Sequence, residues 1–110
     1  MEASAKFPLT MKWQAGRQGT GYRKLELFLY HNWDMYLIYY PPNTCIPTHT
    51  DKVLGKQHYR LNILLWGEDK FKGETLFATK RIKLFRPDIM PHSVEKVSSK
   101  RLVFSIGWVL

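Results

Sequence analysis

Residues that favour turns interrupt this sequence at short and nearly regular intervals, and that spacing limits what the chain can fold into. The interruptions are glycines, prolines and short polar pairs, including Gly55, Gly67, Gly73, Pro87-Asp88 and Ser98-Ser99. The runs between them are short and rich in β-branched, aromatic and aliphatic residues, which is typical of strands. Apart from a potential turn near the N-terminus, no window of about 11 residues has convincing helical periodicity. The pattern therefore predicts an all-β fold.

About eight strands at this spacing fit a double-sheet jelly roll or a small barrel. The predicted strands cover Leu25–Tyr30, Met35–Tyr40, Cys45–His49, His58–Trp66, Glu74–Ala78, Arg81–Phe85, His92–Val97 and Arg101–Val109. A chain of 110 residues buries somewhat more than ~60% of the surface that its unfolded form exposes, which is enough for one core. We therefore assign residues 1–110 to a single domain.

The composition is that of a globular protein, because 45% of the residues are hydrophobic and 15% are aromatic. No stretch approaches the roughly 20 apolar residues that a membrane span needs, and Met1 to Lys12 contains no apolar run of a secretory signal. The single cysteine, Cys45, excludes an internal disulfide. These features predict a cytoplasmic protein without membrane contacts, either a monomer or a small homo-oligomer.

The chain is strongly basic, with 17 Lys+Arg against 9 Asp+Glu and a net charge of +8. Such a surplus attracts polyanions such as nucleic acid, anionic lipid or an acidic protein. The basic residues are scattered in pairs, however, and form no continuous arm, so a solvated basic surface explains them equally well. One functional hypothesis is therefore a basic nucleic-acid-binding β-barrel, with exposed aromatic side chains for stacking.

A potential metal site is formed by a His-x-Asp triplet, His49-Thr50-Asp51, at the end of a predicted strand. Side chains at positions i and i+2 of a strand point to the same face, so His49 and Asp51 can converge on one ion. His92 begins another predicted strand 41 residues after Asp51. Two histidines and one carboxylate form the facial triad of non-haem Fe(II) oxygenases, although zinc also accepts these ligands. Each residue alone is more commonly structural: a hydrogen-bonded histidine or a turn aspartate.

Arg101 follows His92 by nine residues, across a predicted strand–turn–strand unit. Antiparallel pairing would place the two residues toward the same end of this hairpin. A guanidinium there can form a two-pronged ion pair with a carboxylate. The alternative interpretation is that Arg101 is a surface charge. However, Arg101 is the first residue of an apolar strand, where a charged side chain needs an explanation.

Taken together, these residues resemble the Fe(II)- and 2-oxoglutarate-dependent dioxygenases, most closely the short phage and bacterial members of prolyl-hydroxylase type. The resemblance covers roughly Met35 to the C-terminus and rests on His49-x-Asp51, Gly73-Glu-Thr-Leu76-Phe77, Phe85-Arg-Pro-Asp88, His92-Ser-Val, Arg101 and Ile106-Gly-Trp108. It implies a double-stranded β-helix, which is the cupin-like jelly-roll fold, and an Fe(II) ion held by the triad. It also implies that O2 and 2-oxoglutarate are consumed to give succinate and CO2 while a second substrate is hydroxylated. In a phage-encoded protein, the expected compartment becomes the host cytoplasm.

The resemblance also implies how 2-oxoglutarate is bound. Arg101 would bind its far carboxylate together with a tyrosine placed just before a proline turn, a position that Tyr40 matches. Tyr36 lies on the same strand face and is the second choice, with ordinary aromatic packing as the alternative. Asn62 stands alone among apolar neighbours; it could contact 2-oxoglutarate or a metal-bound water, or a backbone group instead.

Two departures from the family pattern place substrate recognition in doubt. Val103 stands where many relatives have a serine, and the chain lacks the helices and inserted loops that cradle a substrate. A protein side chain, a nucleobase or a small molecule therefore all remain open as substrate.

The rival hypothesis is a cupin-type module that binds zinc or a sugar-like ligand without catalysis. The presence of Arg101 argues against this hypothesis. His31 and His58 are predicted to be structural or exposed, and Gly16–Tyr22 to be a lid or an ordinary loop.

Overall fold

The computed structural model describes residues 12–15, 21–51, 53 and 55–110, and within these ranges the chain forms strands and turns but no helix. The strands are β1 (Lys12–Ala15), β2 (Arg23–Tyr30), β3 (Trp33–Tyr40), β4 (Ile46–His49), β5 (His58–Trp66), β6 (Phe71–Gly73), β7 (Phe77–Ala78), β8 (Ile82–Phe85), β9 (His92–Val94) and β10 (Arg101–Val109). The all-β prediction is confirmed. None of the described segments provides a helix that could cross a membrane. The predicted lid falls largely on residues 16–20, which lie outside the described part.

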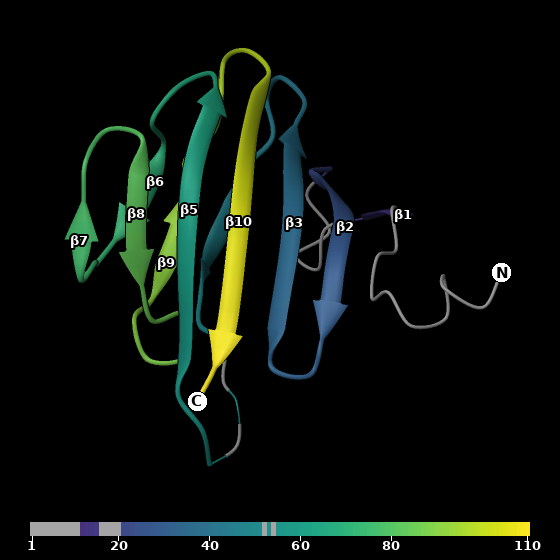
Figure 1. Ribbon diagram of the computed structural model, residues 1–110. Coiled ribbons are helices and arrows are strands. Elements are labelled where there is room, and N and C mark those ends of the chain that lie inside the picture. Colours follow the sequence, from purple (N-terminus) through teal and green to yellow (C-terminus); the bar gives the residue numbers. More distant parts are fainter. Residues whose placement is uncertain (1–11, 16–20, 52, 54) are drawn as a thin grey trace, which may run out of the picture.

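The strands form two sheets that pack face to face (Figure 1). The larger sheet has seven strands in the order β1-β2-β3-β10-β5-β8-β7, and the smaller has three in the order β4-β9-β6, lying behind the larger one in the view of Figure 1. Neighbouring strands are antiparallel in both sheets. This arrangement agrees with the predicted jelly roll, although the described residues form ten strands rather than about eight.

One predicted strand, Glu74–Ala78, is only partly confirmed, because β7 covers Phe77–Ala78 alone and a separate strand, β6, ends at Gly73. Gly73 ends β6 with a φ of 146°, a conformation that side chains rarely adopt. A Cβ at this position would also lie 2.7 Å from the carbonyl oxygen of Pro91. Only glycine lets the chain turn so close to the start of β9. The predicted strand at His92–Val97 is likewise shorter, since β9 ends at Val94. The predicted hairpin between this strand and the Arg101 strand is wrong, because β9 and β10 belong to different sheets.

The apolar core fills one end of the space between the sheets. Its members are Tyr22, Ile38, Tyr40, Leu64, Val94, Val97 and Val103. The strand β10 contributes through strict alternation, with Arg101, Val103, Ser105 and Gly107 buried and the residues between them partly exposed. Burying one side chain of valine size stabilises the fold by about 1.5–3 kcal/mol, so this end anchors the two sheets.

The other end of the same space is polar and hollow. A cavity of about 190 Å³ lies there, and its lining includes Asp34, Tyr36, Arg60, Asn62 and Ser105 from the larger sheet. His49, Asp51 and His92 line it from the smaller sheet and the loop after β4. The inner face of the larger sheet thus changes from apolar to polar along the length of the same strands, and the cavity lies where the polar part begins.

Candidate metal centre and its cavity

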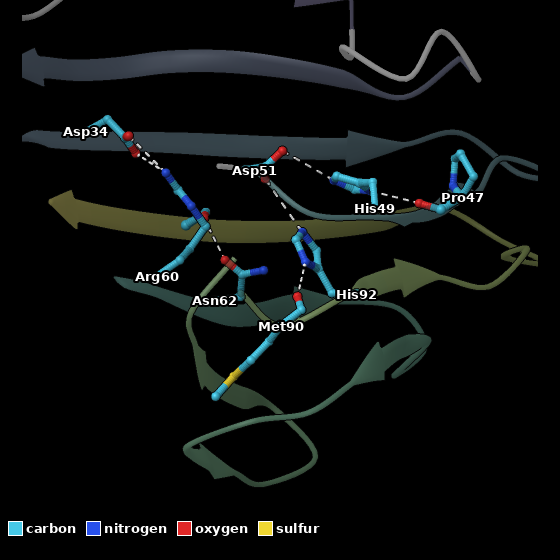
Figure 2. A network of polar contacts seen from close by, with 9 residues as sticks. Asp34, Pro47, His49, Asp51, Arg60, Asn62, Met90 and His92 are labelled. Atoms are coloured by element: carbon cyan, nitrogen blue, oxygen red, sulfur yellow. Dashed lines mark hydrogen bonds and ion pairs between the residues drawn. The ribbon is translucent and has the colours of Figure 1, made fainter. Parts of the chain in front are cut away.

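Three side chains that could hold a metal ion meet on one wall of the cavity. One ligand atom from each of His49, Asp51 and His92 lies within 4.8 Å of the other two. Asp51 faces both rings, with its Oδ1 3.6 Å from His49 Nε2 and its Oδ2 3.6 Å from His92 Nε2 (Figure 2). These separations are too long for hydrogen bonds. The three groups therefore face one another across a gap, as ligands of a shared ion would.

The backbone determines which ring nitrogen each histidine presents. Nδ1 of His49 lies 2.7 Å from the carbonyl oxygen of Pro47, and Nδ1 of His92 lies 2.9 Å from that of Met90. A carbonyl oxygen only accepts hydrogen bonds, so each Nδ1 must carry a proton, which leaves Nε2 as the nitrogen that a neutral ring offers to a metal. Metal-binding histidines are commonly oriented by a bond of this kind. Both Nε2 atoms point at Asp51, which makes the arrangement suitable for a cation.

The local structure explains why these residues meet although they are far apart in the sequence. His49 and His92 are directly opposite each other in the antiparallel pair β4–β9. Asp51 is held by its backbone N–H, which donates to the carbonyl oxygen of Pro87 at 2.6 Å. The rings of Phe71 and Phe85 pack against His92, with centroids 6.3 and 5.0 Å away. Cross-strand pairing, one loop contact and aromatic packing thus each position one part of the cluster.

The turn that precedes His92 is held by an ion pair. Arg86 Nη2 donates to Asp88 Oδ2 at 2.6 Å, and the backbone N–H of Met90 donates to the carbonyl of Arg86 at 2.8 Å. Burial alone would raise the pKa of Asp88, but hydrogen bonds from Arg86 and from the backbone of His58 hold it below its usual value. Asp88 is therefore an ionised link between this turn and β5.

Arg101 is buried, but it does not line the metal cavity itself. Its side chain is 5% exposed, its Nε donates to the carbonyl of Glu68 at 2.9 Å, and its guanidinium stands 4.6 Å from the centroid of the Tyr40 ring. Nη1 has no hydrogen-bond partner among the described residues. The side chain instead lines a second, very small pocket of about 10 Å³, together with Lys80, Arg81 and Lys83. Asn62 and Phe71 line both spaces, so the two adjoin.

The two candidate tyrosines occupy different environments. Tyr40 is 2% exposed and lies at the inner end of the cavity, stacked on Tyr22 with 5.8 Å between ring centroids. Burial raises the pKa of Tyr40 to about 12, although the charge of Arg101 acts in the opposite direction. Tyr40 is therefore a neutral phenol at physiological pH. Tyr36 also lines the cavity, beneath the Lys24 ammonium at 4.9 Å from its ring centroid.

A chain of polar side chains, which sequence analysis missed apart from Asn62, crosses the wall opposite the cluster. Both oxygens of Asp34 accept hydrogen bonds from Arg60 Nη2, at 2.7 and 2.8 Å. Arg60 Nη1 donates to Ser105 Oγ at 2.7 Å, and Ser105 lies 2.5 Å from Asn62 Oδ1. Gly107 makes room for this chain, since a Cβ there would overlap the Arg60 guanidinium. The sequence does contain a pattern that could have predicted these polar contacts. His58, Arg60 and Asn62 are polar at every second position of an otherwise apolar strand.

Of the two expectations for His58, structural or exposed, the exposed one is wrong. This side chain is 9% exposed and lines the metal cavity, so it is not a surface residue. Neither of its ring nitrogens has a hydrogen-bond partner in the part of the chain that the structure describes. Burial, with a smaller contribution from the charge of Arg60, lowers the pKa of His58 below its usual value. His31, by contrast, is exposed, as expected.

No protein-family model matches the sequence, and no curated protein sequence does either. The structure, however, is similar to solved cupin-type structures. A predicted oxalate decarboxylase from Thermotoga maritima has a TM-score of 0.68 at 12% identity, covering 93% of this chain and 94% of that one. The Schizosaccharomyces pombe Cnp3 cupin domain has a TM-score of 0.67 at 13% identity, covering 92% of this chain and 70% of the other. The DMSP lyase DddQ from Ruegeria pomeroyi has a TM-score of 0.65 at 16% identity, covering 96% of this chain and 58% of the lyase.

At these identities the similarity establishes the fold. The neighbours include proteins named as enzymes, and no sequence match links the chain to the 2-oxoglutarate dioxygenases in particular. The chain has a cupin-type double-stranded β-helix fold, with a His-Asp-His cluster in its cavity that could bind a metal ion.

Proposed function

We propose that this protein is a small Fe(II)- and 2-oxoglutarate-dependent dioxygenase. In this proposal His49, Asp51 and His92 hold the metal, and Arg101 binds the far carboxylate of 2-oxoglutarate beside Tyr40. The observation that carries the proposal is the buried Nη1 of Arg101, which has no hydrogen-bond partner among the described residues, in a side chain that lines a pocket adjoining the metal cavity. Without a carboxylate ligand, this buried N–H would remain unsatisfied.

The donor set fits both groups. The cluster has two imidazoles and one carboxylate, and three ligands on one side of an ion leave positions for a chelating co-substrate, as in the facial triad. A buried arginine with an unsatisfied N–H is costly, and a carboxylate would remove that cost by a charge-assisted hydrogen bond. The second pocket has room for about one water-sized group, so it can accept only the end of a ligand.

Each residue then has a specific task. The two Nδ1–H bonds to carbonyl oxygens keep the Nε2 atoms of His49 and His92 aimed at the ion. Arg101 and the neutral Tyr40 provide donors for one end of the co-substrate, while Phe71 and Phe85 exclude water from the side of His92. When bound, Fe(II) would supply the redox chemistry that couples oxidation of 2-oxoglutarate to hydroxylation of a second substrate. The cavity of about 190 Å³ is smaller than typical ligand pockets of ~300–1,000 Å³, which favours binding of the second substrate partly outside it.

Anaerobic addition of Fe(II) and then 2-oxoglutarate tests the proposal. We expect the visible charge-transfer band of a chelated 2-oxo acid, followed by release of succinate when air is admitted. An Asp51→Ala/His92→Ala double variant should give neither signal. Consumption of 2-oxoglutarate by that double variant would show that the cluster is not the site.

A second candidate function is that of a cupin-type metal protein that uses no 2-oxoglutarate. It is favoured by the fold neighbours, which include a predicted oxalate decarboxylase and a lyase. Zinc, normally four-coordinate, would also accept the cluster. Tight metal binding without the charge-transfer band, and without any effect of Arg101→Met on small-molecule binding, would support this candidate instead.

A further inference from the structure

The outer face of the larger sheet, which is turned away from the smaller sheet, is apolar. Because successive side chains of a strand point to opposite faces, the inward positions of β10 alternate with the outward residues Leu102, Phe104, Ile106 and Trp108. All four are apolar and only partly buried, although β10 is the central strand of the sheet. An antiparallel sheet with one face in water normally carries polar residues on that face. The outward side of β10 is therefore unlike that of a solvated sheet.

Strand pairing extends this apolar surface across the neighbouring strands. Ile106 lies directly opposite Met35 of β3 and Leu61 of β5, and Leu61 lies opposite Leu84 of β8. The next row of the surface is formed by Leu37, Phe104, Ile63 and Ile82. None of these side chains is charged, whereas 24% of the residues in the chain are. We refer to the outward side chains of β3, β10, β5 and β8 as the outer apolar face.

The outer apolar face is exposed and large enough to bind another protein. It is turned toward the viewer in Figure 1, and no strand among the described residues lies in front of it. Three of its strands have eight or nine residues and β8 has four; at about 4.8 Å between strands and about 3.4 Å per residue, they cover roughly 500 Å² in projection. Side-chain relief raises the accessible area toward the ~800 Å² that each partner contributes to a standard interface. Monomeric proteins rarely expose a continuous apolar patch larger than a few hundred Å².

The distribution of charge favours a second copy of the chain as the partner. The net charge is +8, so two copies repel each other unless they meet through an uncharged surface. The outer apolar face is such a surface. An acidic partner would gain no ion pairs there and would be attracted to the basic residues elsewhere on the molecule. Homodimer interfaces are also more apolar than the interfaces of transient complexes.

The two ends of the outer apolar face differ in shape in a way that suits a symmetric pair. At one end the ring of Trp108 stacks between those of Trp33 and Tyr59, with centroids 5.4 and 5.9 Å away, and Trp33 is 49% exposed. At the other end of β3 and β10 there is a hollow of about 510 Å³. Its lining consists of Trp13, Arg23, Leu37, Tyr39 and Leu102. A two-fold axis that runs across the strands, in the plane of the interface, would place the aromatic stack of each copy over the hollow of the other.

We propose that the outer apolar face binds a second copy of this chain, so that the protein is a symmetric dimer in which each aromatic stack packs into the hollow of the partner. The inference does not depend on the proposed function, because the metal cavity lies between the two sheets, on the inner side of the larger one. Loss of dimerisation and loss of metal or 2-oxoglutarate binding can therefore be measured separately.

Sedimentation velocity of the full chain over a range of micromolar concentrations tests the proposal. We expect a species of twice the 13.0 kDa chain mass, and a thermal unfolding midpoint that rises with protein concentration. A parent protein that stays monomeric at every concentration would overturn the inference. If that monomer binds phosphatidylcholine vesicles, the face is a lipid-binding surface; if it does not, the chain needs no partner on this face.

A matched pair of substitutions shows whether this face forms the dimer. Ile106→Glu places an unpaired charge in the interface on both copies, and it should weaken the dimer by more than about a hundredfold. Ile89→Glu makes the same change at a position that is 58% exposed and lies outside the face, and it should leave the dimer unchanged. Circular dichroism verifies that both variants are folded. A dimer that tolerates Ile106→Glu would overturn the inference.

Two milder substitutions test the packing of the stack into the hollow and should leave the single chain folded, since both alter outward side chains. Trp33→Ala shortens the stack, and Leu102→Trp fills the hollow. Each should weaken the dimer roughly ten- to hundredfold, as expected for a buried aromatic contact at an interface. Leu76→Trp is the control for the added ring, because Leu76 is exposed outside the face. A dimer unaffected by both Trp33→Ala and Leu102→Trp would overturn this arrangement.

Discussion

The two ends of the space between the sheets are built by the same strands but differ in what those strands place inside. At one end β3, β5 and β10 contribute Ile38, Leu64 and Val103, which pack into the apolar core. At the other end the same strands contribute Asp34, Asn62 and Ser105, and a cavity lies beside them. The side chains that pack into the core and the polar side chains that line the cavity thus lie in different parts of the same strands. Each can therefore be perturbed while the other is measured.

Asp51→Ala should have the largest effect and should act on the polar end alone. Loss of a residue that only supports a metal ligand commonly costs ~10–100-fold in affinity, so loss of a ligand should cost more than about a hundredfold. Calorimetric titration with Fe(II) under anaerobic conditions measures this change. The thermal unfolding midpoint of the metal-free protein should stay close to that of the parent. A large fall would show that the two ends are not independent.

Arg101→Met should produce the next largest effect. A hydrogen bond to a charged group contributes about 1.5–3 kcal/mol, so the affinity for 2-oxoglutarate should fall by roughly ten- to hundredfold. Metal affinity should not change, because Arg101 does not line the metal cavity. Methionine keeps much of the side-chain volume, so the variant should remain folded. Unaltered 2-oxoglutarate binding would remove this residue from the proposed site.

Val103→Ala perturbs the apolar core and leaves the residues of the metal cluster unchanged, although Val103 also lines the small pocket of Arg101. Val103 is 2% exposed, and loss of two buried methyl groups should lower the free energy of unfolding by about 2 kcal/mol. Urea denaturation measures the loss, and metal titration of the folded variant serves as the control. A fall in metal affinity larger than a few-fold would mean that packing at this end also positions the cluster.

Asp88→Asn should have the smallest effect at neutral pH, a loss of about 1–2 kcal/mol from weaker bonds to Arg86 and to the His58 backbone. Because the pKa of Asp88 is lowered in the folded state, its contribution is complete above the ordinary aspartate pKa of about 4 and disappears as the pH falls through the lowered value. The difference in stability between the parent and the variant should therefore shrink below about pH 4. A difference that stays constant down to the lowest pH tested would contradict the role assigned to this carboxylate.

Local patterns were enough to predict much of the fold. The turn-forming residues and apolar runs correctly located β5 and β10 at their observed boundaries, since these strands are long and flanked by clear interruptions. The i, i+2 spacing of His49 and Asp51 gave reason to expect their convergence, and the structure brings both together with His92. The division at Gly73 escaped prediction because the reason for it is a close approach to Pro91, which local sequence does not reveal.

The sequence by itself determined that the chain alternates short strands and turns and that it carries two histidines, an aspartate and an arginine in an order suited to a metal site. Only the tertiary structure decided that Arg101 lines a pocket next to the metal cavity, that the ring nitrogens of His58 are buried with no partner among the described residues, and that Ser105 contacts Asn62. The physical reason is that strand periodicity acts over neighbouring residues, whereas these contacts depend on sheet register. Ser105 and Asn62 are 43 residues apart and meet because β10 pairs with β5.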